Sequence, residues 1–119
     1  MKYMIMMFGD AATAIESHDP QWMRDMIAFM HGLNAELTDS GELVQAVGLT
    51  DGSTGKVVRR SGDGAVVTDG PYAESKESVI GFWMVDVESE ARVVAIAERI
   101  VRWSQVVEIR RIADAPPEV

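Results

Sequence analysis

Side chains capable of acid–base chemistry gather in one charged stretch of the sequence. It reads Asp69-Gly70-Pro71-Tyr72-Ala73-Glu74-Ser75-Lys76-Glu77. A carboxylate at Asp69, Glu74 or Glu77 could act as a general acid or base, because carboxyl groups exchange protons with substrates near neutral pH when they are suitably placed. Lys76 could orient an anion beside it. We therefore expect Asp69 to be a catalytic candidate, and Tyr72, Glu74, Lys76 and Glu77 to be ligand-binding candidates.

The same stretch also has the residue types of a rigid turn. An Asp side chain accepts hydrogen bonds from nearby backbone N–H groups, Gly70 is free to adopt a positive φ, and Pro71 fixes its own φ. Such a corner would deliver the following strand in register. Both interpretations, turn and site, stay open from the residues alone.

His31 and Asp10 are two further candidates for catalysis. Histidine is the side chain that most readily changes charge near neutral pH, which suits a general base. His31 lies at the margin of an apolar helical stripe, so a hydrogen-bonded boundary histidine is the alternative. Asp10 follows a buried strand, where site residues are common, although Gly-Asp is also an ordinary turn.

Two helices are expected to position these residues. Asp19 can cap the first helix and Pro20 suits its first turn, while Gly41 suits its end. Ser89 is a plausible cap for the second helix. Apolar residues recur at helical spacing in both, namely Trp22, Met23, Met26, Ile27, Met30, Leu33 and Leu37 in the first and Val93, Ile96, Ala97, Ile100 and Trp103 in the second.

Six short segments have the composition of β-strands. Residues 3–8 and 79–85 are apolar at nearly every position, which is typical of strands buried on both faces. Residues 42–49 alternate, with Leu43 and Val47 on one face and Ala46 on the other. Residues 56–60 and 65–68 flank a turn and predict a hairpin. Residues 106–112 form a last strand of mixed polarity.

The order of these elements predicts an α+β fold. With the hairpin treated as an insertion, the pattern is the ferredoxin-like βαββαβ arrangement, in which the first and third core strands are central. These are the two strands that are apolar on both faces. We expect one domain over residues 1–113 and a tail over residues 114–119.

A dimer is expected because two helices cover only one face of such a sheet. The other face would expose one apolar set from each central strand. The sets are Tyr3, Ile5 and Met7 or Met4, Met6 and Phe8 in the first strand, and Ile80, Phe82 and Met84 or Gly81, Trp83 and Val85 in the other. Burying three such side chains would contribute roughly 5–8 kcal/mol before the costs of association. A second copy about a two-fold axis is the simplest partner, and a different protein is the alternative.

Composition argues against several classes of partner. The 119-residue chain carries a formal net charge of -8, which disfavours nucleic acid and anionic membrane surfaces. It contains no cysteine, which fits a cytoplasmic protein and excludes thiolate chemistry. No nucleotide-binding or metal-binding motif occurs, so no cofactor and no metal site is expected.

Two segments together carry a family resemblance. The Asp69–Glu77 stretch runs into Val79-Ile80-Gly81-Phe82-Trp83, and the chain opens with Met1-Lys2-Tyr3-Met4 leading to Gly9-Asp10. The sequence resembles the YCII-related proteins, and within them the DGPF branch, whose signature is D-G-P-F-A-E-T-K-E. Tyr72 replaces Phe and Ser75 replaces Thr. The resemblance implies a dimeric α+β barrel with a cleft between sheet and helices.

The resemblance also suggests residues and partners, but no settled reaction. The wider family has a proposed pair of a first-helix His and an Asp after the second helix. His31 is at or next to the first position, whereas the stretch Trp103-Ser104-Gln105-Val106 holds no Asp. Relatives of the DGPF branch are often encoded beside extracytoplasmic-function sigma factors. Two hypotheses follow, namely proton transfer or isomerisation on a small organic molecule, and a non-catalytic ligand-binding or regulatory module.

Overall fold

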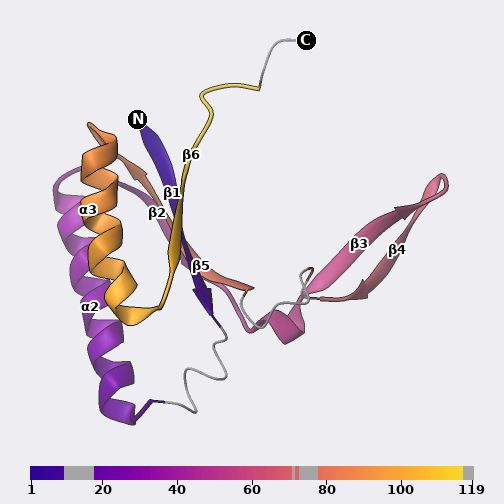
Figure 1. The fold of residues 1–119 in the computed structure, drawn as a ribbon, viewed down its shortest axis with the longest axis horizontal. Helices are drawn as coiled ribbons and strands as arrows, with labels where there is room; N and C mark the ends of the chain where they lie inside the picture. Colours follow the sequence, from indigo (N-terminus) through magenta and orange to yellow (C-terminus); the bar gives the residue numbers. More distant parts are fainter. Residues whose placement is uncertain (10–17, 71, 73–77, 117–119) are drawn as a thin grey trace.

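A four-stranded antiparallel sheet with two helices on one face forms the body of the molecule (Figure 1). The structure is a computed structural model that describes residues 1–9, 18–70, 72 and 78–116. Its elements are β1 (Lys2–Gly9), α2 (Pro20–Asp39), β2 (Leu43–Gly48), the short 3-10 turn η1 (Gly52–Thr54), β3 (Lys56–Ser61), β4 (Gly64–Asp69), β5 (Ser78–Asp86), α3 (Glu90–Ile100), the 3-10 turn η2 (Val101–Trp103) and β6 (Val107–Arg111).

The strand order is β2-β5-β1-β6, so the two most apolar strands are central, as predicted. Every neighbouring pair is antiparallel, and the register places Ile5 opposite both Trp83 and Ile109. With the β3–β4 hairpin set aside, the order and directions agree with a ferredoxin-like α+β fold. The predicted fold class is therefore confirmed at this level.

Both predicted helix caps are present. The Asp19 carboxylate accepts a hydrogen bond from the Trp22 N–H at 2.8 Å, and the Ser89 hydroxyl accepts one from the Arg92 N–H at 3.1 Å. Each satisfies a backbone donor that the first turn leaves unpaired. Gly41, just after α2, has a φ of 79°, which a residue with a Cβ adopts only with strain.

The hydrophobic core lies between the helices and one face of the sheet. In β1 the odd-numbered residues face the helices, and in β5 Trp83 and Val85 do so beside them. The buried core consists of Tyr3, Ile5, Met7, Leu33, Leu37, Trp83, Val85, Val87, Val93, Ile96, Ala97 and Ile100. Only two residues of α2 belong to it, Leu33 and Leu37, and both come from the C-terminal half of that helix.

Because of two irregularities in the sheet, Ile80 and Leu43 lie on the opposite faces of their strands from those predicted. The register between β1 and β5 shifts between Met7 and Phe8, and Ile80 packs against the core instead of joining Phe82. The register between β2 and β5 shifts between Leu43 and Gln45, so Leu43 pairs with Val85 on the side of Ala46. An extra residue in one strand reverses the faces beyond it, and the sequence pattern does not mark where it falls.

The β3–β4 hairpin projects from the body on the side away from the helices (Figure 1). At its base, the Gly70 N–H donates to the Gly55 carbonyl at 2.9 Å. Gly70 does not adopt the positive φ that is open to a glycine. A Cβ at Gly70 would instead lie 3.3 Å from the Gly55 backbone, so glycine is needed there for close approach of two chain segments.

The second face of the sheet carries the other half of the central strands. Met4 pairs with Met84 and Met6 pairs with Phe82, and all four side chains are half-buried. Within the described ranges, no helix covers this face (Figure 1). The predicted apolar open face is therefore present. Neither α2 nor α3 combines the length and apolar composition that crossing a membrane requires.

Candidate functional site

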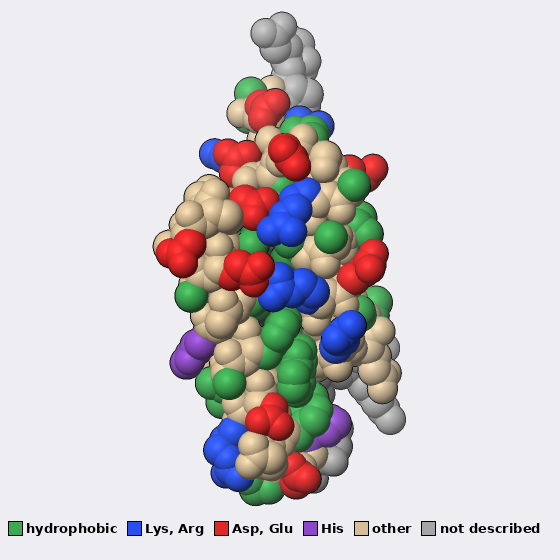
Figure 2. Space-filling view, turned by 90° about the vertical axis from the view of Figure 1, so that its left-hand side faces the viewer, with side chains coloured by type: hydrophobic (Ala, Val, Ile, Leu, Met, Phe, Trp, Pro, Cys, Tyr) green, Lys and Arg blue, Asp and Glu red, His purple; other side chains and the backbone are tan. Residues whose placement is uncertain are grey.

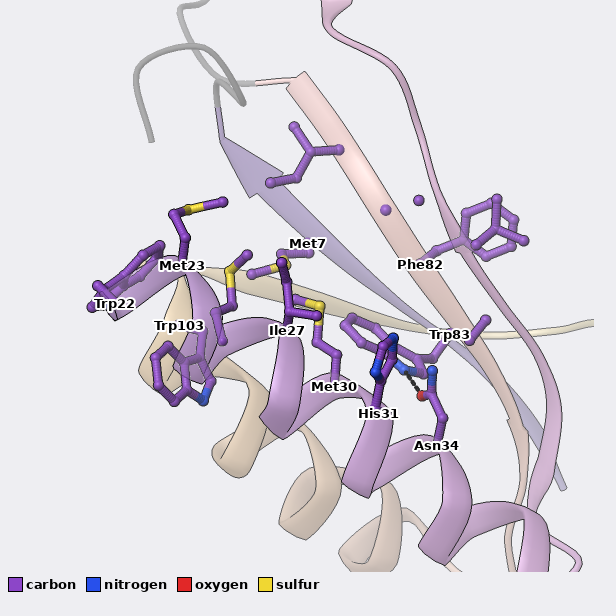
Figure 3. Close-up of a pocket in the computed structure, with 16 residues that line it drawn as sticks. Met7, Trp22, Met23, Ile27, Met30, His31, Asn34, Phe82, Trp83 and Trp103 are labelled. Carbon is purple, nitrogen blue, oxygen red and sulfur yellow. Dashed lines mark hydrogen bonds between the residues drawn. The ribbon is translucent and has the colours of Figure 1, made fainter. Parts of the chain in front are cut away.

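A pocket of about 390 Å³ opens between the N-terminal half of α2 and the sheet (Figure 3). Its walls come from α2, the end of β1, the facing parts of β2 and β5, and Trp103 of η2. It lies where α2 contributes no fully buried residue to the core. The cleft between sheet and helices that the family resemblance implies corresponds to this pocket.

Small residues on the strands make room for the pocket. Ala46, Gly48 and Gly81 share the helix-facing side of β2 and β5, and Gly48 lies directly opposite Gly81. Two glycines at paired positions leave a floor of bare backbone where other strand positions would fill the space. A Cβ at Gly48 would meet no atom within 4 Å, so the space above it is open.

The walls of the pocket are almost entirely apolar. Four methionines and all three tryptophans of the chain line it, namely Met7, Met23, Met26, Met30, Trp22, Trp83 and Trp103. The methionines of α2 line this cavity, and Met30 also packs against the core. Their flexible and polarisable side chains suit such a wall.

Two polar side chains, Asn34 and His31, complete the described lining. The Trp83 indole N–H donates to the Asn34 amide oxygen at 2.8 Å (Figure 3). His31 lies one turn earlier on α2, on the same side of the helix, and is exposed at the rim. The structure thus places one predicted catalytic residue, His31, at a pocket. Sequence reasoning missed Asn34, since only the fold brings it to Trp83.

An aromatic cluster closes the pocket at the start of α2. His18 stacks on Trp22 with ring centroids 3.7 Å apart, and Trp103 lies against both Trp22 and Phe29 at 5.6 and 5.7 Å. Figure 2, which views the helix-covered side, shows a strip of hydrophobic side chains below a region of mixed charge.

Two of the other predicted site residues lie at the base of the hairpin. Asp69 ends β4, and its carboxylate forms an exposed ion pair with the Lys56 ammonium group. Tyr72 is 75% exposed, and its ring centroid lies 5.2 Å from the Arg59 guanidinium carbon. Neither side chain lines the pocket at His31. Asp10, Glu74, Lys76 and Glu77 lie outside the described residues.

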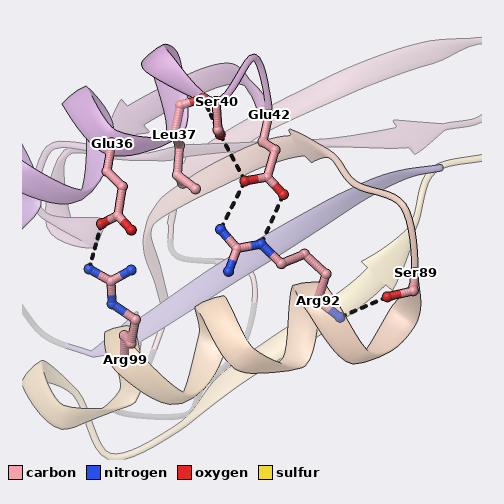
Figure 4. A network of polar contacts seen from close by, with 7 residues as sticks. All are labelled: Glu36, Leu37, Ser40, Glu42, Ser89, Arg92 and Arg99. Carbon is pink, nitrogen blue, oxygen red and sulfur yellow. Dashed lines mark hydrogen bonds and ion pairs between the residues drawn. The ribbon is translucent and has the colours of Figure 1, made fainter.

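A polar network joins the other end of α2 to α3 (Figure 4). The Arg92 guanidinium donates two hydrogen bonds to the Glu42 carboxylate, each at 2.9 Å, and the Ser40 hydroxyl donates a third at 2.8 Å. The Arg92 hydrogen bond lowers the pKa of Glu42 below its ordinary value, and the same contact raises the pKa of Arg92. This network stabilises the fold and does not line the pocket.

A second ion pair ties the two helices together beside that network. The Arg99 guanidinium donates to the Glu36 carboxylate at 2.8 Å and lowers its pKa by hydrogen bonding and charge. Within the ranges that the structure describes, no three His, Asp or Glu side chains gather as a metal site would need. The chemistry visible at the pocket is therefore that of His31 and Asn34.

The fold and the pocket together define an α+β protein with an apolar site between a helix and an antiparallel sheet. The chain matches the YCII-related domain family over residues 1–116, and it belongs to that family. It is also similar to an uncharacterised protein of Rhizobium meliloti (strain 1021), with 27% identity over 92 residues, which make up 75% of this chain and 71% of that protein.

Proposed function

We propose that the protein binds a small, largely apolar organic molecule in the pocket, and that His31 transfers a proton to or from it. The observation that carries this proposal is the position of His31 at the rim of an apolar cavity of about 390 Å³. Cavities of this size, apolar with a few polar groups, are typical of small-molecule sites. An imidazole at their edge is suited to general acid–base work.

The proposal includes an assembly. Two copies pack through the open sheet face as a dimeric α+β barrel, supported by the apolar pairs Met4–Met84 and Met6–Phe82 on that face. The Asp69–Glu77 sequence supports a place in the DGPF branch of the family. One domain over residues 1–113 with a tail over 114–119, in the cytoplasm, fits the element order and the lack of cysteine.

A non-catalytic regulatory module linked to an extracytoplasmic-function sigma factor is the second candidate. One observation favours it, namely that His31 is the only titratable side chain among the described residues of the pocket lining. Asp69, which would share acid–base work with it, pairs with Lys56 instead. A protein that only binds a ligand does not need a second acid–base group beside His31, so the lining fits this candidate as well.

Proton exchange on an apolar ring ketone distinguishes the two candidates. In 2-tetralone, a C–H bond next to the carbonyl breaks, its proton goes to the imidazole, and its electron pair forms an enolate that recaptures a deuteron in D₂O. We expect the protein to accelerate this exchange, followed by proton NMR, and His31→Gln to slow it about a hundredfold. Gly32→Gln, which adds the same side chain in open space one position along α2, is the matched control.

Binding of 2-tetralone with exchange no faster than in buffer containing imidazole would favour the regulatory module. Exchange that is equally fast in wild type and His31→Gln would remove His31 from the mechanism. Absence of any binding would overturn the pocket as a small-molecule site for this class of molecule.

A further inference from the structure

Given the pocket of the proposed function, we infer that its ligand is a flat, apolar ring molecule that carries an acceptor oxygen, a carboxylate or a carbonyl, at one end. Two features of the pocket carry this inference independently. One is the chemistry of its walls, which selects the ring. The other is the orientation of the Asn34 amide, which selects the oxygen.

Methionine and tryptophan side chains line the cavity from both the helix and the sheet. Met23, Met26 and Met30 extend from α2, while Trp83 lies on the sheet side and Trp103 flanks the helix (Figure 3). Thioether sulfur makes favourable contacts with aromatic rings, and indole rings stack on flat partners. Such walls bind a planar polarisable molecule better than a branched or highly hydrated one.

The hydrogen bond from Trp83 fixes which way the Asn34 amide faces. An indole N–H can only donate, so it selects the amide oxygen of Asn34, at 2.8 Å. The amide NH₂ group, which can only donate, is therefore turned the other way. Figure 3 shows Asn34 and His31 side by side at one end of the cavity. That end presents donors, and an imidazole can add another.

Charge in the lining agrees with an acceptor group on the ligand. No Asp, Glu, Lys or Arg is found among the described residues that line the pocket. A ligand ammonium group would find no carboxylate partner among these described residues. A carboxylate or carbonyl oxygen would find the Asn34 amide donors, and an unmatched donor in an apolar site would lose its hydration without compensation.

Two naphthalene probes that differ only in the polar end test the inference. Isothermal titration calorimetry with 2-naphthoate and with 2-naphthylmethylammonium should show the carboxylate binding about tenfold more tightly to the wild-type protein. Asn34→Asp keeps an acceptor for the Trp83 indole but replaces the amide donors with a carboxylate oxygen. In this variant, 2-naphthylmethylammonium should therefore bind more tightly than 2-naphthoate.

Ala35→Asp is the matched control for charge. Ala35 is exposed, lies next to Asn34 on α2 and does not line the pocket, so this variant should keep the wild-type order of the probes. Asn34→Leu should weaken 2-naphthoate alone. Equal affinity for both probes in the wild type, unchanged by Asn34→Asp, would overturn the inference while the pocket stands. Failure of both probes to bind would overturn the pocket as well.

Discussion

Glu42 and Arg92 join the start of β2 to α3 through a pair that is mostly shielded from water. The Glu42 side chain is 17% exposed and receives three hydrogen bonds, two of them from Arg92. Planar, two-point contacts of this kind are the strong form of the ion pair, whereas largely exposed pairs such as Lys56–Asp69 contribute little. At the scale of single residues, the Glu42–Arg92 pair is therefore the charged contact that we expect to stabilise the fold.

Glu42→Gln should lower the free energy of unfolding at pH 7 by about 1–2 kcal/mol, because the Arg92 guanidinium loses a charged partner. Urea denaturation at a fixed protein concentration measures the loss. Because the pKa of Glu42 is lowered in the folded state, its contribution is complete above the ordinary carboxyl pKa and is lost as pH falls through the folded value. The difference in the free energy of unfolding between wild type and Glu42→Gln should thus become smaller in acid.

Asp39→Asn is the control for this comparison, since Asp39 is an exposed carboxylate at the end of α2. It should change stability little at either pH. A Glu42→Gln protein as stable as wild type at pH 7, or a gap that widens in acid, would contradict the assigned role of the pair.

The candidate site could be predicted only in part from the residues. The helical spacing of Trp22, Met26 and Met30 predicted one face of α2, and His31, the site candidate at its margin, lies in the pocket lining. Nothing in the sequence indicated that Asn34 would meet Trp83, 49 positions away. The sequence also did not indicate the partner of Arg92. Glu88 lies four positions before it, but Arg92 donates to Glu42.

At the scale of elements, periodicity and helix caps predicted the order of the helices and strands. They predicted which face of the sheet a strand residue occupies only as far as the register shifts in β1–β5 and β2–β5. Leu43 and Ile80 were assigned to the wrong faces because a single extra residue reverses the alternation. The β2–β5 pair also carries the two glycines of the pocket floor. Their different surroundings make them a natural comparison.

Gly81→Ala should destabilise the protein by about 1–2 kcal/mol, because its Cβ would lie 3.0 Å from the Val47 carbonyl oxygen of the neighbouring strand. Gly48→Ala should be neutral or stabilise by about 0.5 kcal/mol, since the added methyl group meets nothing and the unfolded chain loses freedom. Chemical denaturation of the two variants measures the difference. Equal effects would show that the floor is not packed as described.

At the scale of the whole molecule, the sheet is covered on one side and carries methionine and phenylalanine on the other. The hairpin stands out on that open side (Figure 1). The family resemblance and the apolar pattern both predicted a second copy there, and this assembly stays a prediction. Its strength would come from apolar area, because Met4, Met6, Phe82 and Met84 form the middle of the face.

Met6→Lys should raise the dissociation constant of the dimer about a hundredfold, because a two-fold interface buries the new charge twice. Sedimentation equilibrium over a range of concentrations measures it. Val94→Lys places the same charge on an exposed position of α3 and should leave the dimer intact. A wild-type protein that remains a 13.1 kDa species at high concentration would contradict the barrel.

Trp22, Trp83 and Trp103, the whole tryptophan content of the chain, surround the same cavity. Tryptophan emission from this protein therefore originates at the pocket. One of the three indoles, Trp22, is also stacked on the His18 ring. An unlabelled sample thus carries its own optical reporter of occupancy, with which chemical libraries can be screened before any substrate is known.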